Sequence, residues 1–313
     1  ADLIKKIAPD KTVIGLGSNT PTNFHALNLG VSPQLDGVVD HPYTYSLPPE
    51  KVPFGWNLAE RDGIRVGDAE NTFAGLIGSY REQFRKTGKM RTVWITEFGF
   101  TGFWFDGKNE TGLYAGFTEE AQAVYLVRRF IEGLALPVAV SCQYDFLDDY
   151  GSGEHDAESN FGLLRADYSR KPAFYAVRRM NMLLHNAQPD PAAKVKVTAA
   201  PLHRSAQRGE LIRDWDKQSI AAENGVRAYA FSDPAAPRER MLAVWSMQPY
   251  GREFNNRAVT LEIGGWERFA GLPAAVDLIT GDSFGIPFEV KDGRLRIEDL
   301  PLKEHPLLIT FRE

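Results

Sequence analysis

Hydrophobic and polar positions follow two different patterns along the chain, and the change falls near residue 187. Before that point, short apolar runs alternate with segments whose apolar residues recur at helical spacing. The predicted strands cover residues 12–17, 35–40, 92–97 and 138–145, and the predicted helices cover residues 3–7, 24–29, 73–84, 118–135 and 172–184. This order of strands and helices is typical of a parallel β-sheet.

After residue 187 the apolar runs become shorter and lie between turns rich in Gly, Pro and Asp. A Pro/Ala stretch at residues 188–193 separates the two patterns. The predicted strands cover residues 195–198, 227–231, 241–245, 258–263, 275–278, 295–297 and 307–311. This pattern predicts a compact antiparallel β-sandwich. The sequence therefore predicts two domains, residues 1–187 and residues 188–313.

Residues at the helix ends support these assignments. Thr118 is a predicted N-cap, and Glu119 and Glu120 follow in the first turn, where the helix dipole favours acidic side chains. Gly88 takes the C′ position after the helix at residues 73–84. Pro172 opens the last predicted helix at its first position.

Composition excludes several classes of function. The chain has 313 residues, of which 43% are hydrophobic and 25% charged, and its formal net charge is −5. With this negative net charge, the composition gives no sign of the basic surface that binds nucleic acid or an anionic membrane. No apolar run reaches the ~18 residues of a membrane span. The first residues lack a signal-peptide pattern, but a mature secreted protein has lost that segment, so the compartment stays open.

Cys142 is the single cysteine, which excludes an internal disulfide. It lies in an apolar, strand-like run. A free cysteine in such a run is usually buried and chemically inert. We therefore expect a buried thiol here and no nucleophile.

The stretch at residues 92–102 carries the strongest chemical signal. Its first five residues are β-branched or aromatic, as in a buried strand, and the run ends at Glu97. A strand that delivers one carboxylate at its carboxyl end is the arrangement used by barrel enzymes. The alternative is a strand-end glutamate that pairs with an arginine or caps a loop. Gly99 then allows another backbone or a ligand to approach closely.

Several segments together resemble a known group of enzymes. Residues 94–99, Trp-Ile-Thr-Glu-Phe-Gly, resemble the seventh-strand motif of clan A glycoside hydrolases, whose glutamate is the catalytic nucleophile. His41-Pro42-Tyr43 follows an apolar run, as at the end of the sixth strand of that clan. Residues 161–164 and 171–174 resemble the segment after the eighth strand. Family 39 and related endoglycosidases that cut bacterial exopolysaccharides are the most similar, over residues 9–185 and, more loosely, 225–313.

The resemblance implies an α/β fold class: the C-terminal half (strands 5–8) of a (β/α)8 TIM barrel, followed by an accessory antiparallel β-sandwich. An isolated half barrel exposes unpaired strand edges and an apolar inner face. Three arrangements stay open. The chain is a fragment of a longer enzyme, two copies close a barrel as a homodimer, or the missing N-terminal half is a separate chain. The fragment is favoured, because the first helix starts in mid-pattern.

Retaining cleavage of a glycoside needs two carboxyl groups, roughly 5 Å apart. The resemblance assigns Glu97 as the nucleophile. In the family, the acid/base is the glutamate of an Asn-Glu pair that ends the fourth strand. The chain has one Asn-Glu pair, Asn109-Glu110, in a polar loop with no apolar run before it, which is typical of a solvated pair. The acid/base is therefore expected upstream of this chain.

The carbohydrate-binding candidates lie at strand ends and on loops. By resemblance, His41 and Tyr43 orient Glu97 and line the sugar subsite; the alternative for His41 is a structural role. Tyr144 and Asp145 end the last predicted strand on the same face, and Asp145 binds a hydroxyl or caps the following turn. The clan usually has a tryptophan here, which leaves the chemistry of this subsite open.

Three weaker candidates complete the predicted site. Asn19 ends the first predicted strand and is a candidate polar contact. Trp56 lies in a Pro/Gly-rich loop at residues 46–69, and Trp104 lies in the loop after the Glu97 strand. Their rings suit stacking on sugar faces, although single loop aromatics are often part of a local core.

Other motifs carry little weight. The Gly15-x-Gly17 pair lacks the third glycine of a dinucleotide fingerprint, since Thr20 takes its place. The group Glu154-His155-Asp156 with Glu158 matches no zinc spacing and is interpreted as a solvated loop. We expect no metal and no cofactor.

Two hypotheses follow from the sequence. The first is a retaining glycoside hydrolase that acts on a poly- or oligosaccharide and is periplasmic or extracellular, as the resemblance suggests. The second is a non-catalytic carbohydrate-binding or structural protein derived from the same fold. Binding of saccharide without hydrolysis distinguishes the second from the first.

Overall fold

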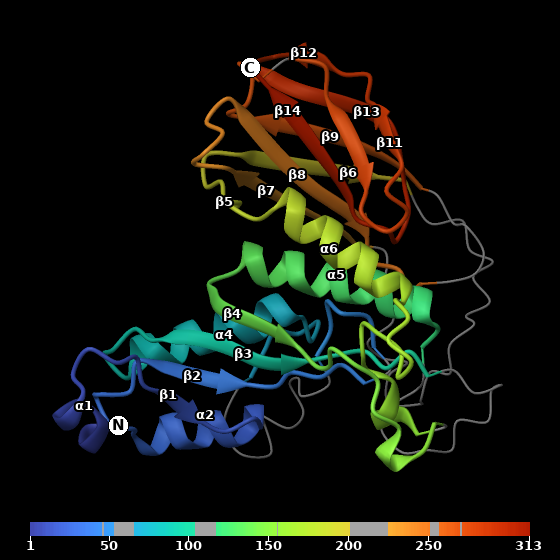
Figure 1. Ribbon diagram of the computed structural model, residues 1–313. Coiled ribbons are helices and arrows are strands. Elements are labelled where there is room, and N and C mark those ends of the chain that lie inside the picture. Colours follow the sequence, from blue (N-terminus) through green and yellow to red (C-terminus); the bar gives the residue numbers. More distant parts are fainter. Residues whose placement is uncertain are drawn as a thin grey trace.

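The structure is a computed structural model of the chain. It describes residues 1–45, 47–52, 66–103, 117–154, 156–200, 225–250, 257–269 and 271–313. Two parts follow one another along the chain: the N-terminal part (residues 1–187) and the C-terminal part (residues 188–313), coloured blue to green and yellow to red in Figure 1.

The N-terminal part contains a four-stranded parallel sheet in the order β1-β2-β3-β4. Its strands are β1 (Ile14–Leu16), β2 (Gly37–Asp40), β3 (Thr92–Phe98) and β4 (Val138–Gln143). Each strand pairs with the next one along the chain. Because all four strands run in one direction, their carboxyl ends meet at the same edge of the sheet, where sites form in α/β folds.

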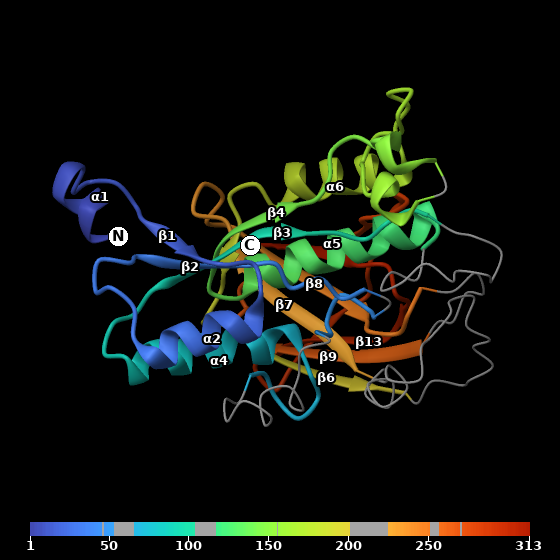
Figure 2. The ribbon, with the colours of Figure 1, turned by 90° about the horizontal axis from the view of Figure 1, so that it is seen from below.

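One helix precedes the first strand of this sheet, and the others come after its strands along the chain. The helices are α1 (Asp2–Ile7), α2 (Thr20–Leu29), α4 (Phe73–Lys86), α5 (Glu119–Ala135) and α6 (Pro172–Leu183), with short 3-10 helices η1 (Tyr150–Ser152) and η2 (Ala157–Asn160) between β4 and α6. Helix α2 contacts α4, and α5 contacts α6 and β4, as Figures 1 and 2 show. The predicted cap is confirmed, because the Thr118 side chain accepts a hydrogen bond from the Ala121 N–H.

The C-terminal part contains two antiparallel sheets. One has the order β11-β10-β14-β8-β7-β5 and the other β12-β13-β9-β6. The strands are β5 (Gln188–Pro189), β6 (Lys194–Ala199), β7 (Val226–Ser232), β8 (Glu239–Ser246), β9 (Arg257–Gly264), β10 (Ala274–Asp277), β11 (Ser283–Gly285), β12 (Glu289–Lys291), β13 (Arg294–Leu302) and β14 (Leu307–Arg312). Apolar residues from both sheets form one shared core.

Helix α5 joins the two parts. It contacts β4, α6, β5 and β7, and it lies between the parallel sheet and the C-terminal strands in Figure 1. Most of its residues are buried. A second core combines apolar residues of the N-terminal part with Phe231, Trp245 and Leu308 of the C-terminal part. The two parts therefore share a hydrophobic interior.

The predicted order of a parallel sheet with helices followed by antiparallel sheets is confirmed. One prediction is wrong, because Cys142 is exposed. It lies on β4, which pairs with β3 on one side and has no other neighbouring strand among the described residues. An apolar run in an edge strand therefore leaves part of its length uncovered.

Candidate active site

The carboxyl ends of the four parallel strands bring the predicted residues together. His41 follows β2, Glu97 is next to last in β3, and Tyr144 follows β4. Backbone bonds connect these ends: the His41 N–H donates to the Ser18 carbonyl at 3.2 Å, and the Tyr144 N–H donates to the Phe98 carbonyl at 2.7 Å. Four separate strands thus contribute to one edge of the sheet.

Both carboxylate oxygens of Glu97 have a partner from the segment after β2. The Tyr43 hydroxyl donates to Glu97 Oε1 at 2.5 Å, and His41 Nδ1 lies 2.8 Å from Glu97 Oε2. The side chains of Glu97 and His41 keep 31% and 24% of their surface exposed, so the carboxylate is held and still accessible. Hydrogen bonds of this kind, on a charged acceptor, are short and directional.

His41 also contacts Thr96 through its other ring nitrogen, with a distance of 2.8 Å between Nε2 and Thr96 Oγ1. When Nδ1 carries the proton, it donates to Glu97 while Nε2 accepts from the Thr96 hydroxyl. When both nitrogens are protonated, Thr96 accepts instead and the imidazolium neutralises the carboxylate. In either form the ring is fixed between two neighbouring residues of β3.

Aromatic rings and a close backbone contact support this arrangement. Phe161 is buried and lies edge-on to Tyr43, with ring centroids 6.0 Å apart, and it also contacts Tyr144 at 5.5 Å. A Cβ on Gly99 would lie 2.1 Å from the Tyr144 carbonyl oxygen. Only glycine fits there, which confirms the expected close approach of a backbone beside Glu97.

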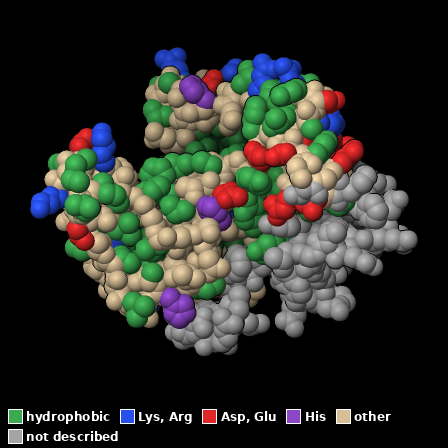
Figure 3. Space-filling view, turned by 60° about the horizontal axis from the view of Figure 1, so that its bottom comes forward, with side chains coloured by type: hydrophobic (Ala, Val, Ile, Leu, Met, Phe, Trp, Pro, Cys, Tyr) green, Lys and Arg blue, Asp and Glu red, His purple; other side chains and the backbone are tan. Residues whose placement is uncertain are grey.

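Other carboxylates surround this edge of the sheet. Burial raises the pKa of Glu158, and the charges of Asp156 and Glu97 add to that increase. Burial likewise raises the pKa of Tyr144, followed in size by the charges of Asp145, Glu158 and Glu97. Figure 3 shows a hollowed face in which a histidine lies beside an acidic side chain, with further acidic side chains along one side. The site is therefore electronegative.

A buried acid network lies directly behind His41. Asp40 has no exposed surface, and its carboxylate accepts bonds from the Thr20 hydroxyl at 2.8 and 2.9 Å, the Tyr80 hydroxyl at 2.6 Å and the His41 N–H at 2.8 Å. Asn23 bonds to the Tyr80 hydroxyl at 3.2 Å and to the Val39 carbonyl at 2.7 Å. This network fixes the end of β2 to α2 and α4.

The protonation of Asp40 predicts a pH dependence of stability. Burial raises the pKa of Asp40 from its usual 3.8 to about 6, although the bonds from Tyr80, Thr20 and His41 lower it. Between these values the folded chain binds a proton that the unfolded chain releases, so stability falls as pH rises from 4 to 6. Two pKa units correspond to roughly 3 kcal/mol. Asp40→Asn should remove this fall.

Urea unfolding of both proteins between pH 4 and 7 measures this effect. The wild-type free energy of unfolding, minus that of Asp40→Asn, should decrease across the range. Asp36→Asn serves as the control, because Lys5 lowers the pKa of Asp36 to about 2, below the window. A difference between wild type and Asp40→Asn that is flat from pH 4 to 7 contradicts a protonated Asp40.

Comparison with known proteins adds the fold-level context. The chain is similar to a family 39 glycoside hydrolase from the gut symbiont Bacteroides cellulosilyticus WH2, with 21% identity, a TM-score of 0.57, and coverage of 99% of this chain and 53% of that chain. It also matches a glucosidase from Croceicoccus marinus (14% identity, TM-score 0.49, 100% and 62% coverage) and a family 44 endoglucanase from Clostridium acetobutylium (8%, 0.47, 99% and 59%). No family model and no curated protein matches the sequence.

Over nearly its whole length, the chain shares the fold of the matching part of this family 39 glycoside hydrolase. The resemblance seen in the sequence is thereby confirmed at the level of the fold. The chain spans about half the length, 53%, of the family 39 glycoside hydrolase. At 21% identity the likeness shows the fold alone, so the activity of this glycoside-hydrolase fold has to be argued from its site.

The weaker site candidates have mixed outcomes in this glycoside-hydrolase fold. The Asn19 side chain caps α2, since its Oδ1 accepts from the Thr22 N–H at 3.1 Å. Asp145 accepts from the Phe146 N–H, the turn-capping alternative, and stays a candidate for a hydroxyl contact. Trp56 and Trp104 lie outside the described residues.

The described part of the chain contains neither a cluster of metal-ligating side chains nor a membrane-spanning helix. No group of three or more His, Cys, Asp or Glu there is placed to hold a metal ion. His155 of the acidic loop falls outside the described residues. None of the described helices has the length and apolarity that crossing a membrane requires.

Sequence reasoning missed three residues that support the site: Asp40, Thr96 and Phe161. Asp40 immediately precedes His41, and an acid that ends an apolar strand run was a usable signal. Thr96 belonged to the recognised strand motif, but strand alternation assigns it to the face opposite Glu97. Its contact with His41 became visible only once the strand ends were placed in space.

Proposed function

We propose that this chain carries the nucleophile of a retaining glycoside hydrolase and that the nucleophile is Glu97. The observation that carries this proposal is the pairing of both Glu97 oxygens, with the Tyr43 hydroxyl at 2.5 Å and the His41 ring at 2.8 Å. A strand-end glutamate with a merely structural role pairs with an arginine or caps a loop. Neither of these partners is among the contacts of Glu97 in the described residues.

In double displacement, Glu97 attacks the anomeric carbon while the leaving oxygen takes a proton from the acid/base. A covalent glycosyl-enzyme forms, and water activated by the same acid/base then releases the sugar. Tyr43 and His41 hold the carboxylate so that one orientation is available for attack, which reduces the entropic cost of reaching the reactive geometry. In the second step the Glu97 carboxylate is the leaving group, and the same two contacts stabilise it as an anion.

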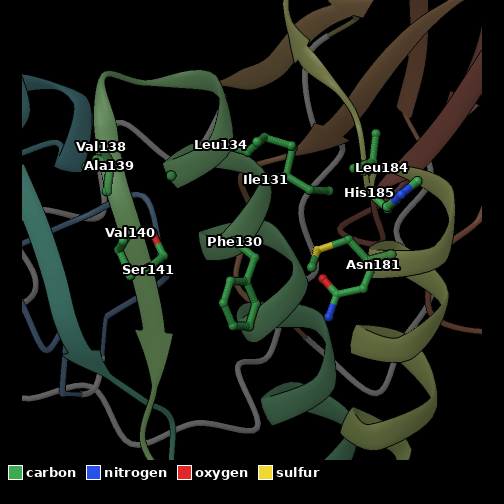
Figure 4. Close-up of a pocket in the computed structure, with 12 residues that line it drawn as sticks. Phe130, Ile131, Leu134, Val138, Ala139, Val140, Ser141, Asn181, Leu184 and His185 are labelled. Atoms are coloured by element: carbon green, nitrogen blue, oxygen red, sulfur yellow. The ribbon is translucent and has the colours of Figure 1, made fainter. Parts of the chain in front are cut away.

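The acid/base belongs, in our proposal, to additional β/α units that complete a (β/α)8 barrel. The β1 and β4 edges of the parallel sheet have no strand partner among the described residues. A groove of about 270 Å³ lies beside β4, lined by apolar side chains of β4, α5 and α6 together with the polar side chains of Ser141, Asn181 and His185, as Figure 4 shows. A further β-strand beside β4, with its helix in this groove, would cover both the edge and the apolar walls.

The mass of the native gene product identifies the source of these units. A mass well above 35.0 kDa supports a longer polypeptide that contains them. A chain of 35.0 kDa in a particle of twice that mass supports pairing of two copies, and a larger mixed particle supports a separate partner chain. A lone 35.0 kDa particle contradicts barrel completion.

The substrate class we propose is an O-linked poly- or oligosaccharide, and the location is periplasmic or extracellular. Tyr43 and Tyr144, together with Asp145, line the edge of the sheet where the sugar would bind. The aromatic faces suit packing on a sugar ring, and the carboxylates suit its hydroxyls. No cofactor enters this chemistry.

An activated aryl glycoside tests the function, because its leaving group needs little help from an acid. We expect a burst of aryl release equal to the concentration of sites, as Glu97 is glycosylated. Continued turnover then indicates a working acid/base, whereas stalling after the burst indicates that this partner is absent. Saccharide binding without any burst supports the non-catalytic alternative and contradicts Glu97 as nucleophile. Stopped-flow absorbance of the released phenol provides the measurement.

A further inference from the structure

The segment that carries His41 and Tyr43 ends at a buried carboxylate, Glu50. Glu50 has no exposed surface and lies between β2 and α4. Arg128 of α5 donates to it twice, from Nε to Oε1 at 2.7 Å and from Nη2 to Oε2 at 2.5 Å. The Trp245 indole N–H of β8 donates to Oε1 at 2.6 Å. The C-terminal part thus contacts the active-site segment directly.

Arg128 extends this contact to a second stretch of the C-terminal part. Its Nη1 donates to the Gln248 carbonyl at 2.9 Å and its Nη2 to the Met247 carbonyl at 3.1 Å. Arg128 and Trp245 are both fully buried. Burial raises the pKa of Glu50, whereas the charge and hydrogen bonds of Arg128 lower it. The lowering prevails, so the pKa of Glu50 falls below its usual value. The carboxylate is therefore ionised and fixed in place.

Two prolines and two hydrogen bonds restrict the described residues that precede and include Glu50. The rings of Pro48 and Pro49 fix the backbone φ angle. The Thr44 hydroxyl bonds to the Leu47 carbonyl at 3.0 Å, and the Phe73 N–H bonds to the Glu50 carbonyl at 2.8 Å. Because these contacts hold the backbone beside Glu50, we expect a displacement of Glu50 to reach Tyr43 and His41.

We propose that Glu50 is a positioning residue through which the C-terminal part holds His41 and Tyr43 against Glu97. The C-terminal part is then a structural component of the active site and not an independent module attached to it. The inference rests on the proposed function only for its consequence in catalysis. The geometric claim, that Glu50 sets the position of His41, has its own readout.

Glu132 of α5 provides a matched control. It is as fully buried as Glu50 and lies at the same interface, where Arg227 Nε contacts its Oε1 at 3.2 Å and the Tyr229 hydroxyl donates to that atom at 2.9 Å. The side-chain hydrogen-bond partners of Glu132 in the described residues are in β7, with none in the segment after β2. Glu132→Gln thus disturbs the interface without removing a hydrogen bond of that segment, although the charges of Glu132 and Glu50 act on each other.

The experiment is NMR of the full chain labelled with 15N-histidine. The chain has six histidines. His41→Asn identifies the His41 signal, and Glu97→Gln shows where that signal moves when its carboxylate partner is lost. We expect Glu50→Gln to move the His41 ring 15N shifts towards the Glu97→Gln position. Glu132→Gln should leave them at the wild-type position, even though both variants lower the Tm.

Each outcome decides the inference. Unmoved His41 shifts in Glu50→Gln overturn it, and equal shifts in Glu50→Gln and Glu132→Gln also overturn it, because they indicate general loosening. If Glu50→Gln does not fold, Trp245→Phe removes one hydrogen bond and should give a smaller shift in the same direction. Absence of an aryl burst in the wild type contradicts the proposed function alone, since the His41 signal does not depend on turnover.

Discussion

Glu97→Gln should reduce turnover of an activated aryl glycoside by roughly 10⁴- to 10⁶-fold, the range seen when a nucleophile is removed. The amide has the shape of the carboxylate and can still accept from the Tyr43 hydroxyl. It cannot form a glycosyl ester, however, so the burst should disappear along with steady-state turnover. Stopped-flow release of the phenol measures both.

The fold should be unaffected, since Glu97 keeps 31% of its side-chain surface exposed and forms no buried ion pair. The Tm and the far-UV circular dichroism of Glu97→Gln should therefore match the wild type. Glu154→Gln is the matched control, because Glu154 is an exposed carboxylate in the loop after β4. Its activity should stay within about tenfold of the wild type. Normal turnover by Glu97→Gln would exclude Glu97 as the nucleophile.

The parts of the fold that were predicted from the sequence are those with local causes. Strand β3 has a continuous β-branched and aromatic run, and α5 begins at Thr118 with acidic residues behind it. The start of α2 was placed too late, at Phe24, although Asn19 as N-cap and a proline near the first helical position signalled it. The strands β11 and β12 were missed because each is short and exposed.

The contacts of His41 and Tyr43 with Glu97 were predictable for a related reason. Parallel strands bring their carboxyl ends together, so a His-Pro-Tyr segment after β2 and a glutamate at the end of β3 meet whatever lies between them. The sequence pattern could not show that His41 and Tyr43 contact different carboxylate oxygens of Glu97, which the structure shows.

The contacts of Glu50 could not be predicted in this way. Glu50 and Trp245 are 195 positions apart, and the sequence around Glu50 has the Pro-rich character of a surface loop. Single charged residues in such loops are usually solvated. Glu50 forms a fully buried ion pair with Arg128, and this burial depends on the docking of the C-terminal part on α5.

Arg128→Met should lower the free energy of unfolding by about 3–5 kcal/mol, because it leaves the buried carboxylate of Glu50 without its cation. Methionine keeps much of the volume, so the loss comes from the charge and from the two carbonyls at residues 247 and 248 that Arg128 also satisfies. Urea unfolding at pH 7 measures the loss. The deficit should shrink as pH falls, since the unpaired Glu50 can then bind a proton.

Two comparisons determine whether the buried pair causes the loss. Arg165→Met breaks the partly exposed pair with Glu119 at the start of α5, which should cost no more than about 1 kcal/mol. The double variant Glu50→Gln/Arg128→Met should be more stable than Arg128→Met, because no uncompensated charge remains buried. If the double variant loses the sum of the two single losses, the residues act independently. The ion pair would then not be what couples the C-terminal part to the active-site segment.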